Sequence, residues 1–377
     1  MKERLVSLDA FRGFTIAAML LVNNPGDWGH LYGPLAHAKW DGWTFTDWIF
    51  PFFVFISGIS MTISLGRRAA LGDPRHVLLI QTVRRAAVII AIGLLLNFIP
   101  TFDLAQLRIP GVLQRLGLCT LLTAPLVLYW RWRGQLVWLI GLLVFYTLVQ
   151  TLVPVPDAQG VWHTGSLQPG QDVGAWLDRT LMEGHLWRSS TTWDPEGLLS
   201  TLPAVASQLA GVLVGHWLAQ PRDPMEKTVW LLVLGLALLW IGQVLGAWSM
   251  PINKSLWSPA YVLFTAGWAC LLFGVCYWLL DAQPDSHLRA SASWFAKPLV
   301  IFGMNALFLF ALSGLIAKML GFIRMTPSLT LKGWLFAPLQ ASGLAPVNAS
   351  LAFALLFTSG LFVIAWALWR KGWFIKV

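Results

Sequence analysis

The sequence has little charge for its length. Of 377 residues, 11% are Asp, Glu, Lys or Arg, whereas about 25% is usual in soluble domains. Apolar residues make up 57%, and the mean hydropathy is +0.66. A water-soluble fold of this size could not bury so much apolar surface, and the excess would form exposed, aggregating patches. The scarcity of charge therefore argues against an ordinary soluble enzyme and predicts an integral membrane protein.

Cysteine and tyrosine are also scarce. The three cysteines, Cys119, Cys270 and Cys276, lie in apolar runs without the spacing of a metal or redox site, so we expect neither a disulfide framework nor a metal. No glycine-rich phosphate loop, nucleophile elbow or zinc-ligand spacing is present, so those catalytic classes are not indicated. Tyrosine occurs 5 times against 23 tryptophans and 22 phenylalanines, a balance that suits a membrane protein with interfacial anchors.

Acidic residues are too few to balance the basic ones, and the net charge is +9. The basic residues lie in short loops between apolar runs rather than in one patch, so we expect no nucleic-acid partner. At the amino terminus, Lys2, Glu3 and Arg4 precede an apolar run that lacks a small-residue cleavage site. We therefore expect a retained first helix rather than a signal peptide.

Several apolar runs have the length of about 20 residues that a membrane-spanning helix needs. We count ten: 8–24, 44–66, 77–99, 110–130, 135–153, 198–218, 228–247, 257–279, 297–319 and 349–369. Helices satisfy the backbone hydrogen bonds of such runs in lipid, so the predicted fold is all-α and polytopic, with 1–377 as one domain. An even number of spans places both termini on one side of the membrane.

The loops predict which side that is. If both termini are cytoplasmic, the inner segments carry twice as many Lys and Arg residues as the outer segments, although the outer segments are longer in total. Three outer loops, 25–43, 154–197 and 320–348, are long and polar. We therefore expect cytoplasmic termini and a polar outer surface.

His37 is the candidate proton-transfer residue of the first outer loop. Histidine exchanges a proton readily near neutral pH, and Asp41 and Asp47 lie nearby in the sequence. A solvated loop histidine is the alternative interpretation, and Asp47 equally suits a first helical turn behind a Thr44 cap. Asn23 lies roughly 22 Å along the first helix from its inner mouth, where its amide could end the helix or donate to a substrate carbonyl.

Several arginines lie within or beside apolar runs. Arg12 can pair with Asp9 on one helical face. Arg84 and Arg85 lie within 77–99, and Arg115 lies within 110–130. An arginine in hydrocarbon is costly unless it is paired or functional, and the few acids nearby favour a polyphosphate ligand. Snorkelling to the membrane surface is the alternative.

The remaining polar candidates each allow a structural interpretation as well as a functional one. Asp194 and Glu196 suit a helix start with Pro195 in its first turn. Lys254 precedes the run 257–279, and Asn305 places an amide inside the run 297–319.

Taken together, the motifs resemble those of the heparan-α-glucosaminide N-acetyltransferase family, in the order in which that family has them. The likeness covers nearly the whole chain and includes the His-Ala-Lys-Trp-Asp-Gly string at 37–42. The other matching strings are 7–13, 22–23, 47–55, 108–117, 193–197, 253–257 and 303–305. Each string alone is weak evidence, and the ordered set is strong.

The resemblance implies acetyl transfer from cytosolic acetyl-CoA to an amino sugar across the membrane, with His37 as the catalytic residue and Asn23 beside it. In this interpretation the donor site holds Arg12, Arg84, Arg85, Arg115 and Asn305. The acceptor site holds Trp40, Asp41, Asp47, Asp194, Glu196 and Lys254. His37 either deprotonates the sugar ammonium or carries the acetyl group itself.

The sequence departs from the family in two ways. It has no large lumenal domain before the first motif, and the loop between Asn23 and His37 is slightly longer. These departures suggest a compact relative in a bacterial inner membrane that acts on glucosamine or a short amino-sugar oligomer. The expected partners are acetyl-CoA, the acceptor and the bilayer, with a homodimer as an option. A transporter of amino sugars and an O-acetyltransferase of an envelope glycan remain alternatives.

Overall fold

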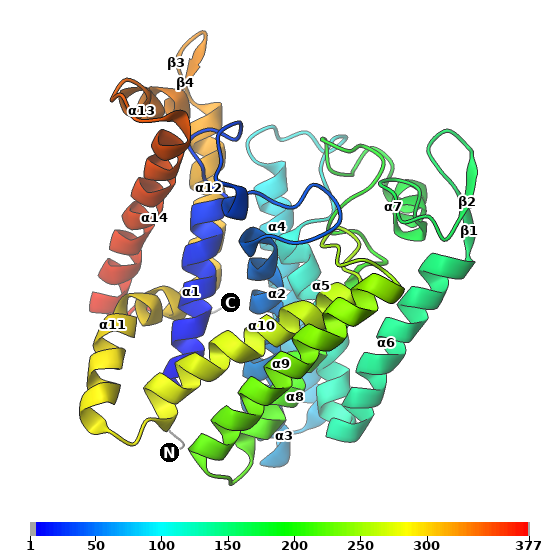
Figure 1. The fold of residues 1–377 in the computed structure, drawn as a ribbon. Helices are drawn as coiled ribbons and strands as arrows, with labels where there is room; N and C mark the ends of the chain where they lie inside the picture. The colour runs from blue at the N-terminus through cyan, green and yellow to red at the C-terminus, as the bar shows by residue number, and fades with distance from the viewer. Residues whose placement is uncertain (1–4, 376–377) are drawn as a thin grey trace.

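A computed structural model of the protein describes residues 5–375 and consists largely of helices (Figure 1). Lys2, Glu3 and Arg4, which precede the first predicted run, lie outside the described residues. The long helices are α1 (Val6–Val22), α2 (Phe45–Met61), α4 (Arg75–Phe98), α5 (Val112–Tyr129), α6 (Trp132–Leu152), α8 (Thr201–Ala219), α9 (Pro224–Trp248), α10 (Pro259–Tyr277), α11 (Ser286–Met304), α12 (Ala306–Phe322) and α14 (Pro346–Arg370).

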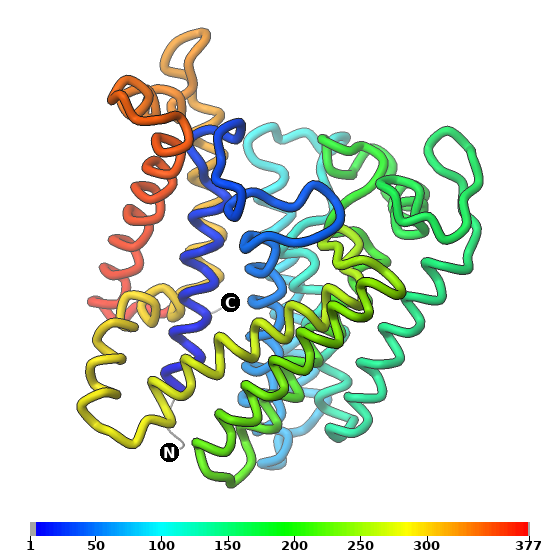
Figure 2. Tube along the Cα trace, viewed as in Figure 1, coloured from blue at the N-terminus to red at the C-terminus, as the bar shows by residue number. Residues whose placement is uncertain are grey.

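The shorter elements gather mainly at one end of the bundle, the upper end in Figure 1. They are η1 (Gly33–Leu35), β1 (Pro154–Pro156), β2 (Trp162–Thr164), α7 (Val173–Met182), β3 (Arg324–Thr326), β4 (Leu329–Thr330) and α13 (Leu331–Gln340). β1 pairs antiparallel with β2, and β3 with β4. All of these elements fall within the three loops that the sequence predicts to be long, polar and outer. The connection from α1 to α2 also passes over this end (Figure 2).

The prediction of an all-α polytopic membrane protein is confirmed. Among residues 5–375, eight helices are long and apolar enough to cross a membrane, or nine if the bent pair α11–α12 counts as one span. Each of the ten predicted runs contains a helix, and α1 is short at 17 residues. The number ten stays a prediction. Helices α2, α5, α8 and α10 bury more than half of their spans, whereas α4, α6, α9 and α14 are peripheral.

Two predicted runs differ in detail from the structure. The run 297–319 is not one helix, because α11 and α12 meet at an angle of 71°. Asn305 lies between them with φ −125° and ψ 34°, outside the helical region. The run 44–66 continues from α2 through a π-helical turn, η2 (Thr62–Gly66), into α3 (Arg67–Ala70). Isolated π-turns inside helices occur frequently at functional sites.

Glycines set the closest helix crossings. A Cβ atom on Gly13 of α1 would lie 1.6 Å from a backbone oxygen of α11, and one on Gly303 of α11 would lie 2.0 Å from a backbone oxygen of α1. Gly58 of α2 and Gly211 of α8 approach the partner backbone as closely, at 2.0 and 1.9 Å. Small residues allow such backbone contact between membrane helices. Two tightly packed pairs result, α1–α11 and α2–α8.

The inner end of α1 is capped by another helix. Its first backbone N–H groups, on Val6 and Ser7, donate to the carboxylate of Asp281 at 3.1 and 3.0 Å. Asp281 belongs to η3 (Trp278–Ala282), the π-helical turn that continues α10. Unpaired N–H groups at a helix start need such an acceptor, so this contact fixes α1 against α10.

Candidate active site

The loop that precedes α2 is folded around Asp47. Asp47 lies in the first turn of α2, is 1% exposed, and completes a capping box with Thr44. Its Oδ2 atom accepts hydrogen bonds from the backbone N–H groups of Thr44 and Ala38, both at 3.0 Å. Its Oδ1 atom lies 2.6 Å from Nδ1 of His37, whose side chain is 46% exposed. Asp47 therefore serves both as a helix cap and as the partner of His37.

This pairing determines what His37 can do. A carboxylate at Nδ1 favours the tautomer in which Nδ1 carries the proton and Nε2 carries the lone pair. A base oriented by a buried acceptor in this way is the arrangement that general-base and nucleophilic catalysis both require. The half-exposed ring of His37 thus presents Nε2 as a proton acceptor or nucleophile.

Lys254 reaches His37 from the segment before α10. Its Nζ atom lies 3.2 Å from Nε2 and 3.3 Å from Nδ1 of the imidazole. The same segment is joined to the first outer loop by the side chain of Asn253, which donates to Asp41 at 3.1 Å. Burial lowers the pKa of Lys254, against the opposing effect of Glu196 and Asp47. The structure therefore brings two predicted acceptor residues, Asp47 and Lys254, to His37, and joins a third, Asp41, to Asn253 beside Lys254.

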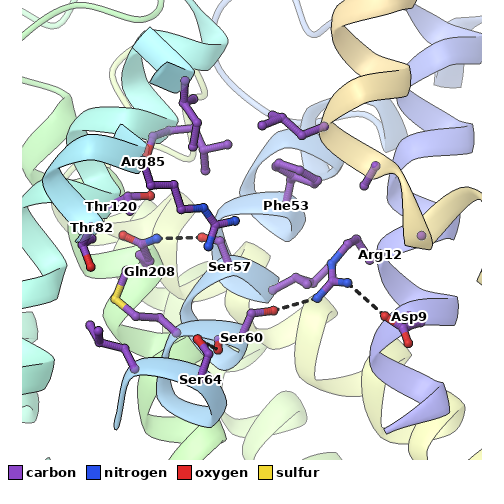
Figure 3. Close-up of a pocket in the computed structure, with 18 of the residues that line it drawn as sticks. Asp9, Arg12, Phe53, Ser57, Ser60, Ser64, Thr82, Arg85, Thr120 and Gln208 are labelled. Carbon is purple, nitrogen blue, oxygen red and sulfur yellow. Dashed lines mark hydrogen bonds and ion pairs between the residues drawn. The ribbon is translucent and has the colours of Figure 1, made fainter. Parts of the chain in front are cut away.

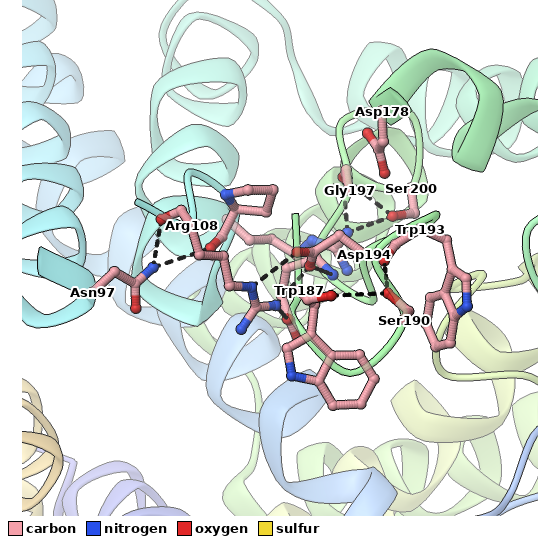
Figure 4. A network of polar contacts seen from close by, with 12 residues as sticks. Asn97, Arg108, Asp178, Trp187, Ser190, Trp193, Asp194, Gly197 and Ser200 are labelled. Carbon is pink, nitrogen blue, oxygen red and sulfur yellow. Dashed lines mark hydrogen bonds and ion pairs between the residues drawn. The ribbon is translucent and has the colours of Figure 1, made fainter. Parts of the chain in front are cut away.

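Two further predicted acceptor residues form an ion cluster with Arg108 (Figure 4). Arg108 donates through Nε and Nη2 to Asp194 at 2.9 and 2.6 Å, and through Nη2 to Glu196 at 2.6 Å. Burial alone would raise the pKa of Glu196, but Arg108 and Lys254 hold it below its ordinary value. The influence of Lys254 on Glu196 links this cluster to the His37 site. Asn97 supports it by donating to the backbone oxygen of Arg108 at 2.8 Å.

Two aromatic residues of the outer side make contacts that the sequence did not indicate. Trp40, predicted to contact substrate, donates through Nε1 to Leu167 O at 2.9 Å and packs edge-on against Trp193. It therefore joins two outer loops. Trp43 is 39% exposed and packs on Trp48 with ring centroids 5.1 Å apart. Sequence reasoning passed over Trp43 because its exposure depends on how the loop folds.

Asn23, predicted to lie beside His37, takes no part in the hydrogen bonds around His37. It is the C-cap of α1, its backbone N–H donates to Met19 O, and its side chain is exposed. Within the described part of the chain, its amide makes no hydrogen bond to His37 or to any other side chain. Its neighbour Asn24 is buried and donates to Leu20 O at 2.8 Å.

A cavity of about 750 Å³ lies beside α2, beyond the turn that holds Asp47 (Figure 3). Residues of α1, α11 and α12 line one wall of the cavity, and residues of α2, α4, α5 and α8 line the other. Two of the predicted arginines, Arg12 and Arg85, line it. Arg12 pairs with Asp9 at 3.0 Å and donates to Ser60 at 2.8 Å. Arg85 has no ion-pair partner among residues 5–375, so its charge remains free for an anionic ligand.

The other predicted donor-site arginines lie elsewhere. Arg84 is exposed and does not line the cavity, because successive residues of a helix point about 100° apart. Arg115 is 1% exposed, donates to Gly197 O at 2.9 Å and to Ser200, and stacks on Trp257. It therefore anchors the start of α8 below the outer ion cluster. Its position does not support a role at the phosphates of a ligand in this cavity.

Several polar residues of the cavity were not predicted from the sequence, among them Arg68, Ser57 and Gln208. Arg68 lies on α3 and pairs with Asp73 at 2.7 Å. Gln208 donates to Ser57 at 2.7 Å, and its own Oε1 atom is buried with no partner among the described residues. The signal available was a lone amide inside the apolar run 198–218, since buried polar groups in membrane spans tend to be functional.

Helix α2 connects the two regions. Its first turn holds Asp47 beside His37, and from Phe53 onward its side chains line the cavity. Six residues of helix separate Asp47 from Phe53, which corresponds to roughly 9 Å along the axis. The inner cavity and the outer histidine are therefore adjacent along one rigid element.

Comparison with known proteins gives consistent matches. Residues 4–252 match the family model described as heparan-alpha-glucosaminide N-acetyltransferase, catalytic. The human heparan-alpha-glucosaminide N-acetyltransferase is 30% identical over 366 residues, covering 81% of this chain and 52% of the relative. The mouse protein of the same name is 28% identical over 363 residues, covering 82% and 53%. The chain thus spans about half the length of these curated relatives.

Proposed function

The chain belongs to the heparan-alpha-glucosaminide N-acetyltransferase family, and from this premise we propose that it transfers an acetyl group from acetyl-CoA to the amine of an amino sugar. The donor occupies the inner cavity from the cytosol, and the acceptor reaches His37 from outside. One observation carries the proposal: α2 holds Asp47, the partner of His37, in its first turn and lines the basic cavity from Phe53 onward.

The residues of the cavity fit acetyl-CoA chemically. Arg12, Arg68 and Arg85 supply cationic donors for its phosphates, and only Arg85 among them lacks an acidic partner in the described chain. The unpaired Oε1 of Gln208 can accept from an amide N–H of the pantetheine arm. No group of three or more metal-binding side chains occurs within residues 5–375, and the proposed reaction uses no metal.

The acetyl transfer follows from the position of Nε2. In the direct route, Nε2 of His37 takes a proton from the sugar ammonium, and the freed amine attacks the thioester carbon. The C–N bond forms, the C–S bond breaks, and coenzyme A leaves as the thiol after taking up a proton. In the alternative route, Nε2 attacks the thioester carbon, the C–S bond breaks and coenzyme A leaves as the thiolate. The neutral amine then attacks the acetylated imidazole, the C–N bond to the sugar forms as the bond from Nε2 to the acetyl carbon breaks, and the proton lost by the amine converts the thiolate to the thiol. Asp47 stabilises the positive charge that the imidazole gains in either route.

The acceptor lies in the region bounded by Lys254, Asp41 and the carboxylates of Asp194 and Glu196. Glucosamine carries one ammonium and several hydroxyl groups, which these side chains suit as acceptors and donors. Asn23 stands at the outer end of α1, where its exposed amide is available to the sugar. We place the protein in a bacterial inner membrane with its basic loops in the cytosol, and we retain a homodimer as a prediction.

An assay of the purified protein tests this proposal. Acetyl-CoA with glucosamine should give N-acetylglucosamine and free coenzyme A in equal amounts, and N-acetylglucosamine should not be acetylated further. Acetylation of N-acetylglucosamine would instead indicate transfer to a hydroxyl group. Uptake of unmodified glucosamine into vesicles, without coenzyme A release, would indicate a transporter.

A further inference from the structure

The carboxyl-terminal end of the described chain forms part of the inner cavity. After α14, Gly372 turns the backbone with φ +67°, a left-handed conformation that glycine adopts readily. The N–H of Trp373 then donates to Leu368 O at 2.9 Å, which closes the helix end. Phe374 and Ile375 follow, and both line the cavity. We call residues 373–375 the tail strap.

Asn305 holds the tail strap by its backbone. Its Nδ2 atom donates to Trp373 O at 3.1 Å, and its Oδ1 atom accepts from the N–H of Ile375 at 2.8 Å. Asn305 is 1% exposed and lies where α11 and α12 meet at 71°. Its neighbours Gly303, Met304 and Ala306 line the same cavity. The helix bend, the amide and the strap therefore make up one wall.

This arrangement gives Asn305 a different role from the one expected. The sequence placed its amide in the donor site as a group that binds the ligand directly. In the structure its oxygen and one N–H already bind the strap, so both halves of the amide are engaged. The contact joins residues 68 and 70 positions apart, which explains why sequence spacing did not indicate it.

The strap side chains suit the less polar part of a ligand. Phe374 and Ile375 are 42% and 41% exposed although they lie at a cavity, because they face its open volume. Arg12 and Arg85 stand on α1 and α4 of the same cavity. The cavity thus combines cationic groups with an apolar surface, as a ligand with a polyphosphate end and a long uncharged arm requires.

We propose that Asn305 is a positioning residue that holds the tail strap as an apolar wall of the donor site, where Phe374 and Ile375 contact the arm of the acyl-CoA. This inference rests on the proposed function, in which the cavity binds acetyl-CoA. It adds a segment of the chain outside the region matched by the family model, residues 4–252.

The test removes the wall in three ways, each in the protein of 377 residues purified in detergent. One variant ends after Gly372, one is Asn305→Ala, and one replaces both strap side chains, Phe374→Ala with Ile375→Ala. Each should raise the Kd for coenzyme A, measured by titration calorimetry, about tenfold, and should raise the KM for acetyl-CoA without changing that for glucosamine. Asn305→Ala combined with the truncation should bind no more weakly than the truncation alone, since both act through the strap.

Asn348→Ala provides a matched control, because Asn348 lies in the first turn of α14, bonds Tyr32, and is far from the strap along the helix. It should leave coenzyme A binding unchanged. The strap side-chain variant keeps the Asn305 contacts, so it decides the matter even if Asn305→Ala folds poorly. Equal or tighter coenzyme A binding by the truncated and side-chain variants would overturn the inference while leaving the proposed function intact. Failure of the unaltered protein to bind coenzyme A would overturn the proposed function and this inference with it.

Discussion

Two histidines of the first outer loop make nearly the same contact. His30 lies 2.6 Å from Asp27, and His37 lies 2.6 Å from Asp47. Their surroundings differ, because Asp47 is almost fully buried whereas Asp27 is exposed, and only His37 also has Lys254 within 3.3 Å among the described residues. A buried carboxylate holds an imidazole in one orientation, which an exposed one does not. At this scale the environment, rather than the residue type, marks the catalytic candidate.

This pair gives a controlled test of the catalytic histidine. His37→Ala should reduce acetyl transfer by about 10²–10⁴-fold, as removal of a general base usually does, while coenzyme A binding and thermal stability stay nearly unchanged. His30→Ala removes the same side chain and the same kind of contact, and should leave turnover unaffected. A well-folded His37→Ala protein that keeps most of its turnover would rule out His37 as base or acetyl carrier.

Arg84 and Arg85 allow a second comparison between neighbours. Arg85→Gln should weaken coenzyme A binding by about 1.5–3 kcal/mol for each charged hydrogen bond lost, because Arg85 lines the cavity. Arg84→Gln, one residue away on α4 and outside the cavity lining, should leave the affinity unchanged. The loss should shrink with a short acetyl thioester that lacks the nucleotide. The same loss with both donors would mean that Arg85 supports α4 rather than binding phosphate.

At the scale of the element, α2 and α7 make different contributions. The first part of α2 sets the spacing between His37 and the cavity, and the π-turn η2 that follows α2 places Ser64 and Leu65 in the lining of that cavity. Helix α7 lies outside the bundle and supports the start of α8 through Asp178, whose Oδ1 accepts from the N–H of Leu198 at 2.9 Å. This support depends on a buried carboxyl group.

The Asp178 contact predicts a dependence of stability on pH. Burial raises the pKa of Asp178 to about 7, whereas an unfolded aspartate titrates near ~3.9. The folded state therefore binds the Asp178 proton more tightly than the unfolded state does. The protonated carboxyl group thus stabilises the fold at low pH, and this contribution is lost as pH rises from about 4 to about 7. Asp178→Asn keeps an oxygen acceptor without the charge. Its melting temperature should exceed that of the unaltered protein at pH 8, and the difference should vanish near pH 4. A gain of equal size at both pH values would exclude ionisation of Asp178 as the cause.

At the scale of the whole molecule, the polar loops gather at one end and the basic turns at the other. The end with α7, α13 and the two hairpins holds the His37 site, and the opposite end holds α3 and the turn between α8 and α9 (Figure 1). Excess Lys and Arg on the second end favours its placement in the cytosol. The donor cavity, with Arg68 on α3 among its lining residues, then faces the compartment that contains acetyl-CoA.

Cysteine labelling can establish this orientation. In intact cells, a membrane-impermeant maleimide should reach cysteines introduced at exposed positions of 154–197 and 320–348. Cysteines introduced at 71–73, between α3 and α4, should react only after the membrane is opened. Labelling of 71–73 from outside would reverse the orientation and remove the cytosolic donor from the proposal.

The sequence by itself determined the class of fold and most helix positions. Hydropathy over some 20 residues is a local property. In lipid, an apolar run must satisfy its backbone hydrogen bonds internally, and a helix does so. The ordered motifs also identified the family and predicted His37 as the catalytic candidate, together with Asp47 and Lys254, which contact it. Even the first-turn role of Asp47 was visible locally, since its capping partner Thr44 is three residues away.

Only the tertiary structure decided which candidates meet. Lys254 reaches His37 across 217 positions, Arg108 reaches Asp194 across 86, and Asn305 binds the strap across 68 and 70. The tertiary structure also showed that Arg85 lines the cavity, whereas Arg84 and Arg115 do not. A polar side chain in a membrane protein is satisfied by whichever partner helix packing brings within about 3 Å, and that packing depends on crossings such as Gly13 on Gly303 rather than on local pattern.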